Sequence, residues 1–153
     1  MPIVAWRAWR PTHSGLLAGV VTCAVWPSDD AMLGECRKNH AVAYYEQPGG
    51  PGVSAPAHRA PHEGCQCGVY GHASLADLEA EPWMRDAIVV GRAKLWGRVV
   101  DHERGWRAER GRVTALVDHP AADRESTVDA ARRYGVPVVA LSEASVWAGR
   151  WLL

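Results

Sequence analysis

The sequence predicts a single α+β domain: an antiparallel, β-rich sheet with a long hairpin, a C-terminal β-α-β unit and short helices. Three observations support this prediction. The chain has 153 residues, which is the length of one ordinary domain. Apolar and polar side chains alternate over residues 88–100, and this period of two is typical of a half-buried strand. A strand-helix-strand pattern follows over residues 112–141, so we expect one domain over residues 1–153.

Short strands and one short helix are expected in the first half of the chain. Apolar and β-branched residues over 4–10 and 16–26 predict two strands, each followed by a proline that ends it. Residues 47–61 contain four prolines and three glycines, which predicts an irregular surface loop. Ser74, followed three residues later by an aspartate, has the spacing of a capping box that opens a short helix, and Pro82 ends it.

The second half of the chain predicts a hairpin followed by the β-α-β unit. The strand over residues 88–100 is expected to pair with a return strand over residues 106–117. A helix over residues 126–134, with a capping box at its first residue, leads to a strand over residues 136–141. A last short helix is expected over residues 142–148.

Cysteines and histidines concentrate between residues 58 and 72, where two thiols and three imidazoles lie within 15 residues. Both side-chain types are good ligands for a borderline-soft ion such as zinc. Cys36 and His40 lie upstream of the Pro/Gly loop, with a spacing that shares one face of a helical turn. The sequence therefore predicts a metal site, with zinc as the expected cofactor, that joins the two segments. The preferred ligands are Cys36, Cys65, Cys67 and His62, and the alternatives are His72, His40, His58 and Cys23.

The C-x-C spacing of Cys65 and Cys67 leaves other interpretations open. An extended C-x-C segment puts both sulfurs on one face, whereas typical zinc knuckles use C-x2-C. The two cysteines can instead be buried apolar side chains, a redox pair or a catalytic thiol. Four protein ligands would make the metal structural, and an open coordination position would indicate catalysis; three thiolates favour the structural role.

Cysteine content and hydropathy favour a cytoplasmic protein. The longest apolar stretch, residues 15–26, is too short to span a bilayer as a helix, so no membrane partner is expected. Four cysteines would predict two disulfides in a secreted protein, but in a reducing cytoplasm they predict thiols or metal ligands. The net charge of zero argues against a strong attraction of the whole surface to nucleic acid or anionic membranes.

The predicted hairpin is the most basic part of the chain. Residues 85–112 carry eight basic and four acidic residues, and two tryptophans lie among the arginines. Aromatic rings beside guanidinium groups can stack bases or hold phosphates. A solvated strand face with cross-strand pairs between arginine and glutamate is the alternative. The candidate partner-binding residues are Trp96, Trp106, Arg92, Lys94, Arg98 and Arg107.

Two segments resemble small proteins from actinobacteria. Cys65-Gln-Cys67-Gly-Val-Tyr matches their C-x-C-G-x-Y element. The segment that begins at Leu95 matches L-W-G-x-V-x-x-H-x-x-G-[YW]-R-A, with Trp106 at the aromatic position after the glycine. The resemblance covers roughly residues 65–138 and implies a shared domain, but it implies no particular activity.

Three functions are consistent with these features. The first is a metal-stabilised binding or regulatory module that contacts a protein or a small-molecule ligand through the Trp96/Trp106 face of the hairpin. The second is a nucleic-acid-associated protein that uses the basic hairpin. The third, which the ligand set favours least, is an enzyme that uses a reactive cysteine or a metal-bound water. No sequence feature fixes the oligomeric state.

Overall fold

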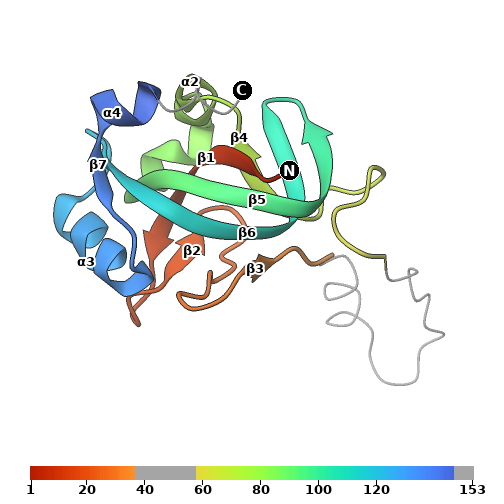
Figure 1. Cartoon of the computed structure of the whole chain (residues 1–153), viewed down its shortest axis with the longest axis horizontal. Coiled ribbons are helices and arrows are strands. Elements are labelled where there is room, and N and C mark those ends of the chain that lie inside the picture. The colour runs from red at the N-terminus through yellow and green to blue at the C-terminus, as the bar shows by residue number, and fades with distance from the viewer. Residues whose placement is uncertain (37–57, 147–153) are drawn as a thin grey trace.

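A computed structural model describes residues 1–36 and 58–146, and it confirms the α+β class, with a seven-stranded, mostly antiparallel sheet (Figure 1). Of the predicted Pro/Gly loop over residues 47–61, residues 47–57 lie outside this described part. The elements are β1 (Ile3–Pro11), β2 (Leu17–Gly19), β3 (Met32–Leu33), β4 (Val69–His72), α2 (Leu75–Glu79), the 3-10 helix η1 (Pro82–Asp86), β5 (Val89–His102), β6 (Gly105–Asp118), α3 (Arg124–Tyr134), β7 (Val138–Ala140) and α4 (Leu141–Val146).

The predicted long hairpin is confirmed and dominates the fold. Strands β5 and β6 have 14 residues each and are joined only by Glu103 and Arg104. Their register shifts twice, between Arg92 and Ala93 and again between Trp96 and Val99, and such bulges bend a strand and increase its twist. At the second shift Gly97 has a φ of +80°, a conformation that side chains rarely adopt, so glycine is required there.

Four strands pair around a closed ring. Strand β1 pairs with both β5 and β4, and β6 pairs with the same two strands from the other side. The ring closes tightly at Gly71 of β4, where an added Cβ would lie 2.4 Å from the Cβ of Ala5. The far end of the hairpin is therefore held against β4, which is the strand that follows the cysteine-rich loop.

Alternate residues of β1 face two separate hydrophobic cores. Ala5 and Trp9 belong to a core that α3 covers with Ala130 and Ala131. Trp6 and Ala8 face the other core, which α2, η1 and α4 cover. Leu78, Met84 and Ala144 are the side chains that these three elements contribute to it. Helices thus lie on both faces of the sheet, with α3 well separated from α2 and α4 in Figure 1.

Tryptophans occupy the core positions that phenylalanine, absent from this chain, would otherwise fill. Trp6, Trp9 and Trp26 are each 2% exposed or less. Trp9 and Trp26 meet edge to face, with ring centroids 5.4 Å apart, which is a favourable geometry for an aromatic pair.

The strand predicted over residues 16–26 is wrong beyond its first residues. Strand β2 spans only Leu17–Gly19, and the chain then turns back so that Val25 forms an isolated bridge with Ala18. Backbone hydrogen bonds close the turn, from Cys23 N–H to the Gly19 carbonyl and from Gly19 N–H to the Ala24 carbonyl. Trp26 is buried in the core with Trp9, and tertiary burial of this kind overrides the strand propensity of the β-branched residues before it.

The predicted β-α-β unit is confirmed, because β6 and β7 are parallel and α3 connects them. Helix α3 begins two residues earlier than expected. Its N-cap is Asp123, whose carboxylate accepts a hydrogen bond from the Ser126 N–H at 2.9 Å, so the predicted capping box at Ser126 does not form the cap. Gly135, with a φ of +63°, ends the helix. The predicted last helix corresponds to α4, and residues 147–148 lie outside the described part of the chain.

Candidate metal centre

Three cysteines and one histidine gather where β3 and the loop before β4 meet. Their ligand atoms, the sulfurs of Cys36, Cys65 and Cys67 and a ring nitrogen of His58, all lie within 4.8 Å of one another. Cys36 follows β3, and the other three lie in the loop of residues 58–68, drawn in yellow beside the hairpin end in Figure 1. This group, called here the Cys3His group, can hold a metal ion.

Two distances within the Cys3His group match the edges of a tetrahedron around zinc. Bonds of about 2.3 Å to sulfur and about 2.0 Å to nitrogen place two sulfurs about 3.8 Å apart, and a sulfur and a nitrogen about 3.5 Å apart. The sulfurs of Cys36 and Cys65 are 3.8 Å apart, and Cys67 Sγ is 3.4 Å from His58 Nε2. A disulfide would need sulfurs about 2.05 Å apart, and none of the four cysteines forms one.

Burial sets the chemistry of these thiols. Cys65 and Cys67 are 7% and 8% exposed and pack with Ala60, while Cys36 is half-buried beside them. Burial, followed by the side-chain hydrogen bond with Cys65, raises the pKa of the Cys67 thiol. Desolvation favours neutral thiols in the absence of a cation, and a bound metal ion supplies the positive charge that stabilises three adjacent thiolates.

Arg107 of β6 organises the loop that carries three of the four ligands. Its side chain is buried, and one terminal nitrogen donates to the backbone carbonyl of His62 at 3.2 Å, to that of Cys67 at 2.9 Å and to that of Cys65. Bonds from a charged donor are stronger than neutral ones, so one guanidinium fixes the path of the whole C-x-C segment.

Gly34 explains how Cys36 reaches the loop. Its N–H donates to the Glu109 carbonyl at 2.7 Å, which extends the short pairing of β3 with β6. An added Cβ at Gly34 would lie 2.8 Å from the Ala108 carbonyl oxygen and 3.0 Å from the Gly68 Cα. Only glycine lets the backbone pass so close to both β6 and the loop, and Cys36 follows two residues later.

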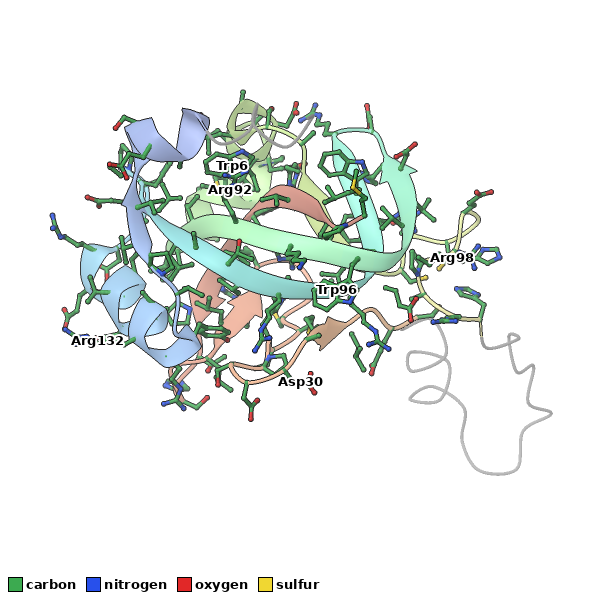
Figure 2. All side chains as sticks on the ribbon, viewed as in Figure 1. Trp6, Asp30, Arg92, Trp96, Arg98 and Arg132 are labelled. Atoms are coloured by element: carbon green, nitrogen blue, oxygen red, sulfur yellow. The ribbon has the colours of Figure 1, made fainter. Side chains whose placement is uncertain are left out.

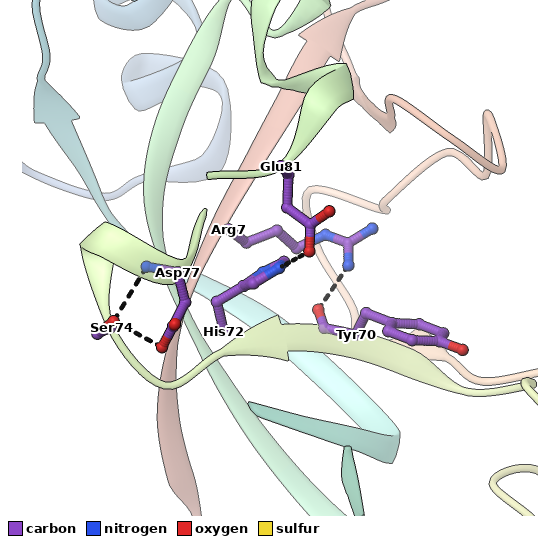
Figure 3. A network of polar contacts seen from close by, with 6 residues as sticks. All are labelled: Arg7, Tyr70, His72, Ser74, Asp77 and Glu81. Atoms are coloured by element: carbon purple, nitrogen blue, oxygen red, sulfur yellow. Dashed lines mark hydrogen bonds and ion pairs between the residues drawn. The ribbon is translucent and has the colours of Figure 1, made fainter. Parts of the chain in front are cut away.

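Strand β4, into which the loop runs, is fastened on both sides (Figure 3). Arg7 of β1 donates to the Tyr70 carbonyl and lies over the Trp26 ring, 4.8 Å from its centroid; burial lowers the pKa of Arg7 to about 10. His72 Nε2 lies 2.9 Å from Glu81 Oε1 of the segment before η1. The Ser74 hydroxyl accepts from the Asp77 N–H at 3.1 Å, so Ser74 caps the start of α2 as predicted, and the hydroxyl donates to the Asp77 carboxylate at 2.7 Å.

The structure places the predicted ligands as follows. Cys36, Cys65 and Cys67 lie in the Cys3His group, and the nitrogen there comes from His58 rather than from His62. His62 is exposed, accepts a hydrogen bond from the Gly64 N–H at Nδ1, and stacks on the His58 ring at 4.7 Å between centroids. His72 forms a hydrogen bond with Glu81 instead. Cys23 is exposed on the turn after β2, and His40 lies outside the described residues.

The predicted partner-binding residues of the hairpin divide into buried and exposed sets. Arg92 is buried and lies over the Trp6 ring at 5.5 Å, and Arg107 is buried under the cysteine-rich loop. Trp106 packs against the core that contains Leu95. Lys94 and Arg98 are exposed. Trp96 is half-buried and lies on the outward face of β5, whereas the preceding residue, Leu95, is buried on the other face. Figure 2 shows the contrast between the Arg92–Trp6 pair and the outward Trp96.

Several supporting residues lie outside the sequence-based prediction. Glu109 pairs with Arg59, the neighbour of His58, and accepts from the Arg98 N–H, which links the loop to the hairpin. These hydrogen bonds keep the pKa of Glu109 below its ordinary value. The separation of 50 residues between Arg59 and Glu109 leaves no signal in the sequence spacing.

A cavity of about 390 Å³ lies beside the Cys3His group. It is lined by Glu63, Val99, Val100, Asp101 and Arg107. Because the carboxylates of Glu63 and Asp101 line this cavity, it would repel a simple anion.

No family model, no curated protein and no solved structure matches the chain. Within residues 1–36 and 58–146, no helix is long and apolar enough to cross a membrane.

Proposed function

We propose that the protein is a zinc-stabilised binding module of regulatory or accessory type, with the Cys3His group as its metal site and the outward face of the hairpin as its interaction surface. The observation that carries the metal proposal is the pair of ligand-atom distances, 3.8 Å and 3.4 Å, which fit a tetrahedral ion. A cytoplasmic location, where thiols stay reduced, fits the same proposal.

Zinc is the proposed ion because the ligand set combines thiolates with an imidazole. Thiolates select soft or borderline ions, and Cys3His is among the common structural zinc sets. Residues that bind magnesium or calcium would be carboxylates and carbonyls, which the Cys3His group does not use.

The proposed role of the ion is to fasten two distant chain segments. Cys36 and Cys65 are 29 residues apart, and their sulfurs would share one ion. Metal binding directly stabilises the folded state, because the unfolded chain has no preformed site. The ion would hold the segment after β3 against the C-x-C loop, and through Arg107 it would stiffen the hairpin.

An enzymatic role finds less support. Four protein ligands fill a tetrahedral shell, and a catalytic zinc keeps one position for water or substrate. The alternative of a reactive cysteine needs a thiolate of lowered pKa, whereas burial raises the pKa of Cys67.

Metal analysis of the purified protein tests the proposal. Protein prepared without chelator should contain close to one equivalent of zinc, and Cys65→Ser should lose most of it. Cys23→Ser is the matched control, because Cys23 is an exposed cysteine outside the Cys3His group, and it should retain the metal. Less than about a tenth of an equivalent of any metal in the unaltered protein would refute a metal-stabilised fold.

A further inference from the structure

Four side chains form a compact patch on the outward face of the hairpin. In the register of β5 and β6, Lys94 lies opposite Arg112 and Trp96 lies opposite Arg110. Cross-strand partners share a face, and so do residues two apart along a strand, so these four project to the same side. This set, called here the basic patch, lies on the side away from the buried Ala93 and Leu95.

Within the described residues, the fold places little negative charge beside the basic patch. Lys94 and Arg112 are exposed, directly opposed like charges, an arrangement that destabilises a sheet. Among the described residues, no carboxylate oxygen lies within 4.0 Å of either side chain. In the described part of the chain, the one ion pair of Arg110 is a 3.9 Å contact with Glu109, which also pairs with Arg59. A solvated strand that served the fold alone would gain from opposite charges here, so the pattern indicates a ligand that carries negative charge.

The position of Trp96 indicates which class of negatively charged ligand suits the basic patch. Its side chain is half-buried, and those of Lys94, Arg110 and the following Arg98 are all exposed. A partly exposed aromatic ring among cations can stack on an unpaired base while the cations contact phosphates. A duplex keeps its bases stacked on one another, so this arrangement suits a single strand.

We propose that the basic patch binds single-stranded nucleic acid, with Trp96 stacking on a base and Lys94, Arg110 and Arg112 contacting the phosphate backbone. This proposal rests on the binding-module function above and names its partner class. It excludes Arg92 and Arg107 from the interface, because both are buried within the fold. With three phosphate contacts, log affinity should fall against log salt with a slope of about −2.

Fluorescence anisotropy with a labelled oligothymidylate of about 15 nucleotides tests the proposal between about 50 and 200 mM salt. Trp96→Ala should weaken binding about 5- to 150-fold, as for the loss of one stacked base. The double variant Lys94→Glu/Arg112→Glu should abolish binding, and it keeps a like-charged cross-strand pair so that the sheet is similarly stable. Arg132→Glu, on the exposed surface of α3, is the matched charge-reversal control and should bind normally.

Three results would overturn the inference. These are no binding at the lowest salt, binding that the patch variants leave unchanged, and tighter binding of polyglutamate that does not depend on Trp96, which would assign the patch to an acidic protein partner. Zinc content and thermal melting are measured on the same samples. Zinc-loaded protein that fails to bind the strand refutes this inference alone, whereas metal-free protein that binds it refutes the zinc proposal alone.

Discussion

Arg107 donates from a buried guanidinium to the carbonyl oxygen of Cys67 at 2.9 Å, across 40 residues of sequence. The same nitrogen reaches the carbonyls of His62 and Cys65. Three thiolates around Zn²⁺ would carry a net charge of about −1, and a cation directly behind the loop compensates it. The stability of the hairpin end and the affinity of the metal site are therefore expected to be coupled.

Removal of the Arg107 guanidinium should lower both the stability of the fold and the metal affinity of the site. Arg107→Met leaves the three carbonyls without their donor, and a buried unsatisfied group costs about 1–3 kcal/mol. We expect the free energy of unfolding to fall by roughly 2–4 kcal/mol and metal affinity to fall with it. Chemical denaturation and competition with a chelator measure the two effects. Arg98→Met, at an exposed site, is the control; equal effects of both variants would contradict the role given to Arg107.

Substitution of His58 and substitution of His62, whose rings stack, should have different effects on metal affinity. His58→Asn removes the proposed nitrogen ligand and should weaken metal binding at least about tenfold, as expected for loss of a direct ligand. His62→Asn should leave metal affinity within a few-fold of the parent protein, because its Nδ1 instead accepts from the Gly64 N–H. Zinc competition with a colorimetric chelator gives both constants. The reverse order would assign the site to His62.

Glycine at position 71 is predicted to be essential for closing the strand ring. An alanine Cβ there would lie 2.4 Å from the Ala5 Cβ and 3.0 Å from a methyl carbon of Leu95, so Gly71→Ala should destabilise the fold by about 3 kcal/mol or more. Gly135→Ala is the contrast: nothing lies within 4 Å, and only its φ of +63° opposes a side chain, at about 1–2 kcal/mol. Thermal melting ranks the two, and an equal or reversed ranking would contradict the ring closure.

The N-cap of α3 should contribute stability that depends on pH. The hydroxyl and backbone N–H of Ser126 hold the pKa of Asp123 below its ordinary value of 3.8. A depressed folded-state pKa gives stability that is present above the unfolded pKa and is lost as the pH falls through the folded pKa. The stability difference between the parent protein and Asp123→Ala should therefore be constant near neutral pH and shrink below about pH 3.8. Urea titrations at several pH values measure it, and a difference that grows in acid would contradict the cap.

Regular patterns in the sequence were sufficient to predict the long hairpin and the β-α-β unit, but not the extent of β2. The alternation over residues 88–100 indicated β5, and the strand-helix-strand pattern near the end indicated the parallel pairing of β6 with β7. The burial of Arg92 was not predictable in the same way. A one-residue register shift moves a side chain to the other face, and the shift beside Arg92 depends on pairing with β6 rather than on local sequence.

The candidate site was predictable in composition but not in detail. Cysteine spacing groups Cys65 with Cys67, and Cys36 lies close enough in sequence to join them. The choice between His58 and His62 depends on the path of the loop, and Arg107 fixes that path from 40 or more residues away. Such long-range hydrogen bonds leave no periodicity or motif in the sequence, so only the structure separates the two histidines.

X-ray absorption at the zinc edge tests the central claim most directly. The account predicts a four-coordinate ion with three sulfur ligands at about 2.3 Å and one nitrogen at about 2.0 Å in the unaltered protein. Cys36→Ser should remove one sulfur from the shell, whereas Cys23→Ser should leave the spectrum unchanged. A shell with fewer than three sulfurs in the unaltered protein, or a spectrum that Cys36→Ser does not alter, would contradict the Cys3His metal centre.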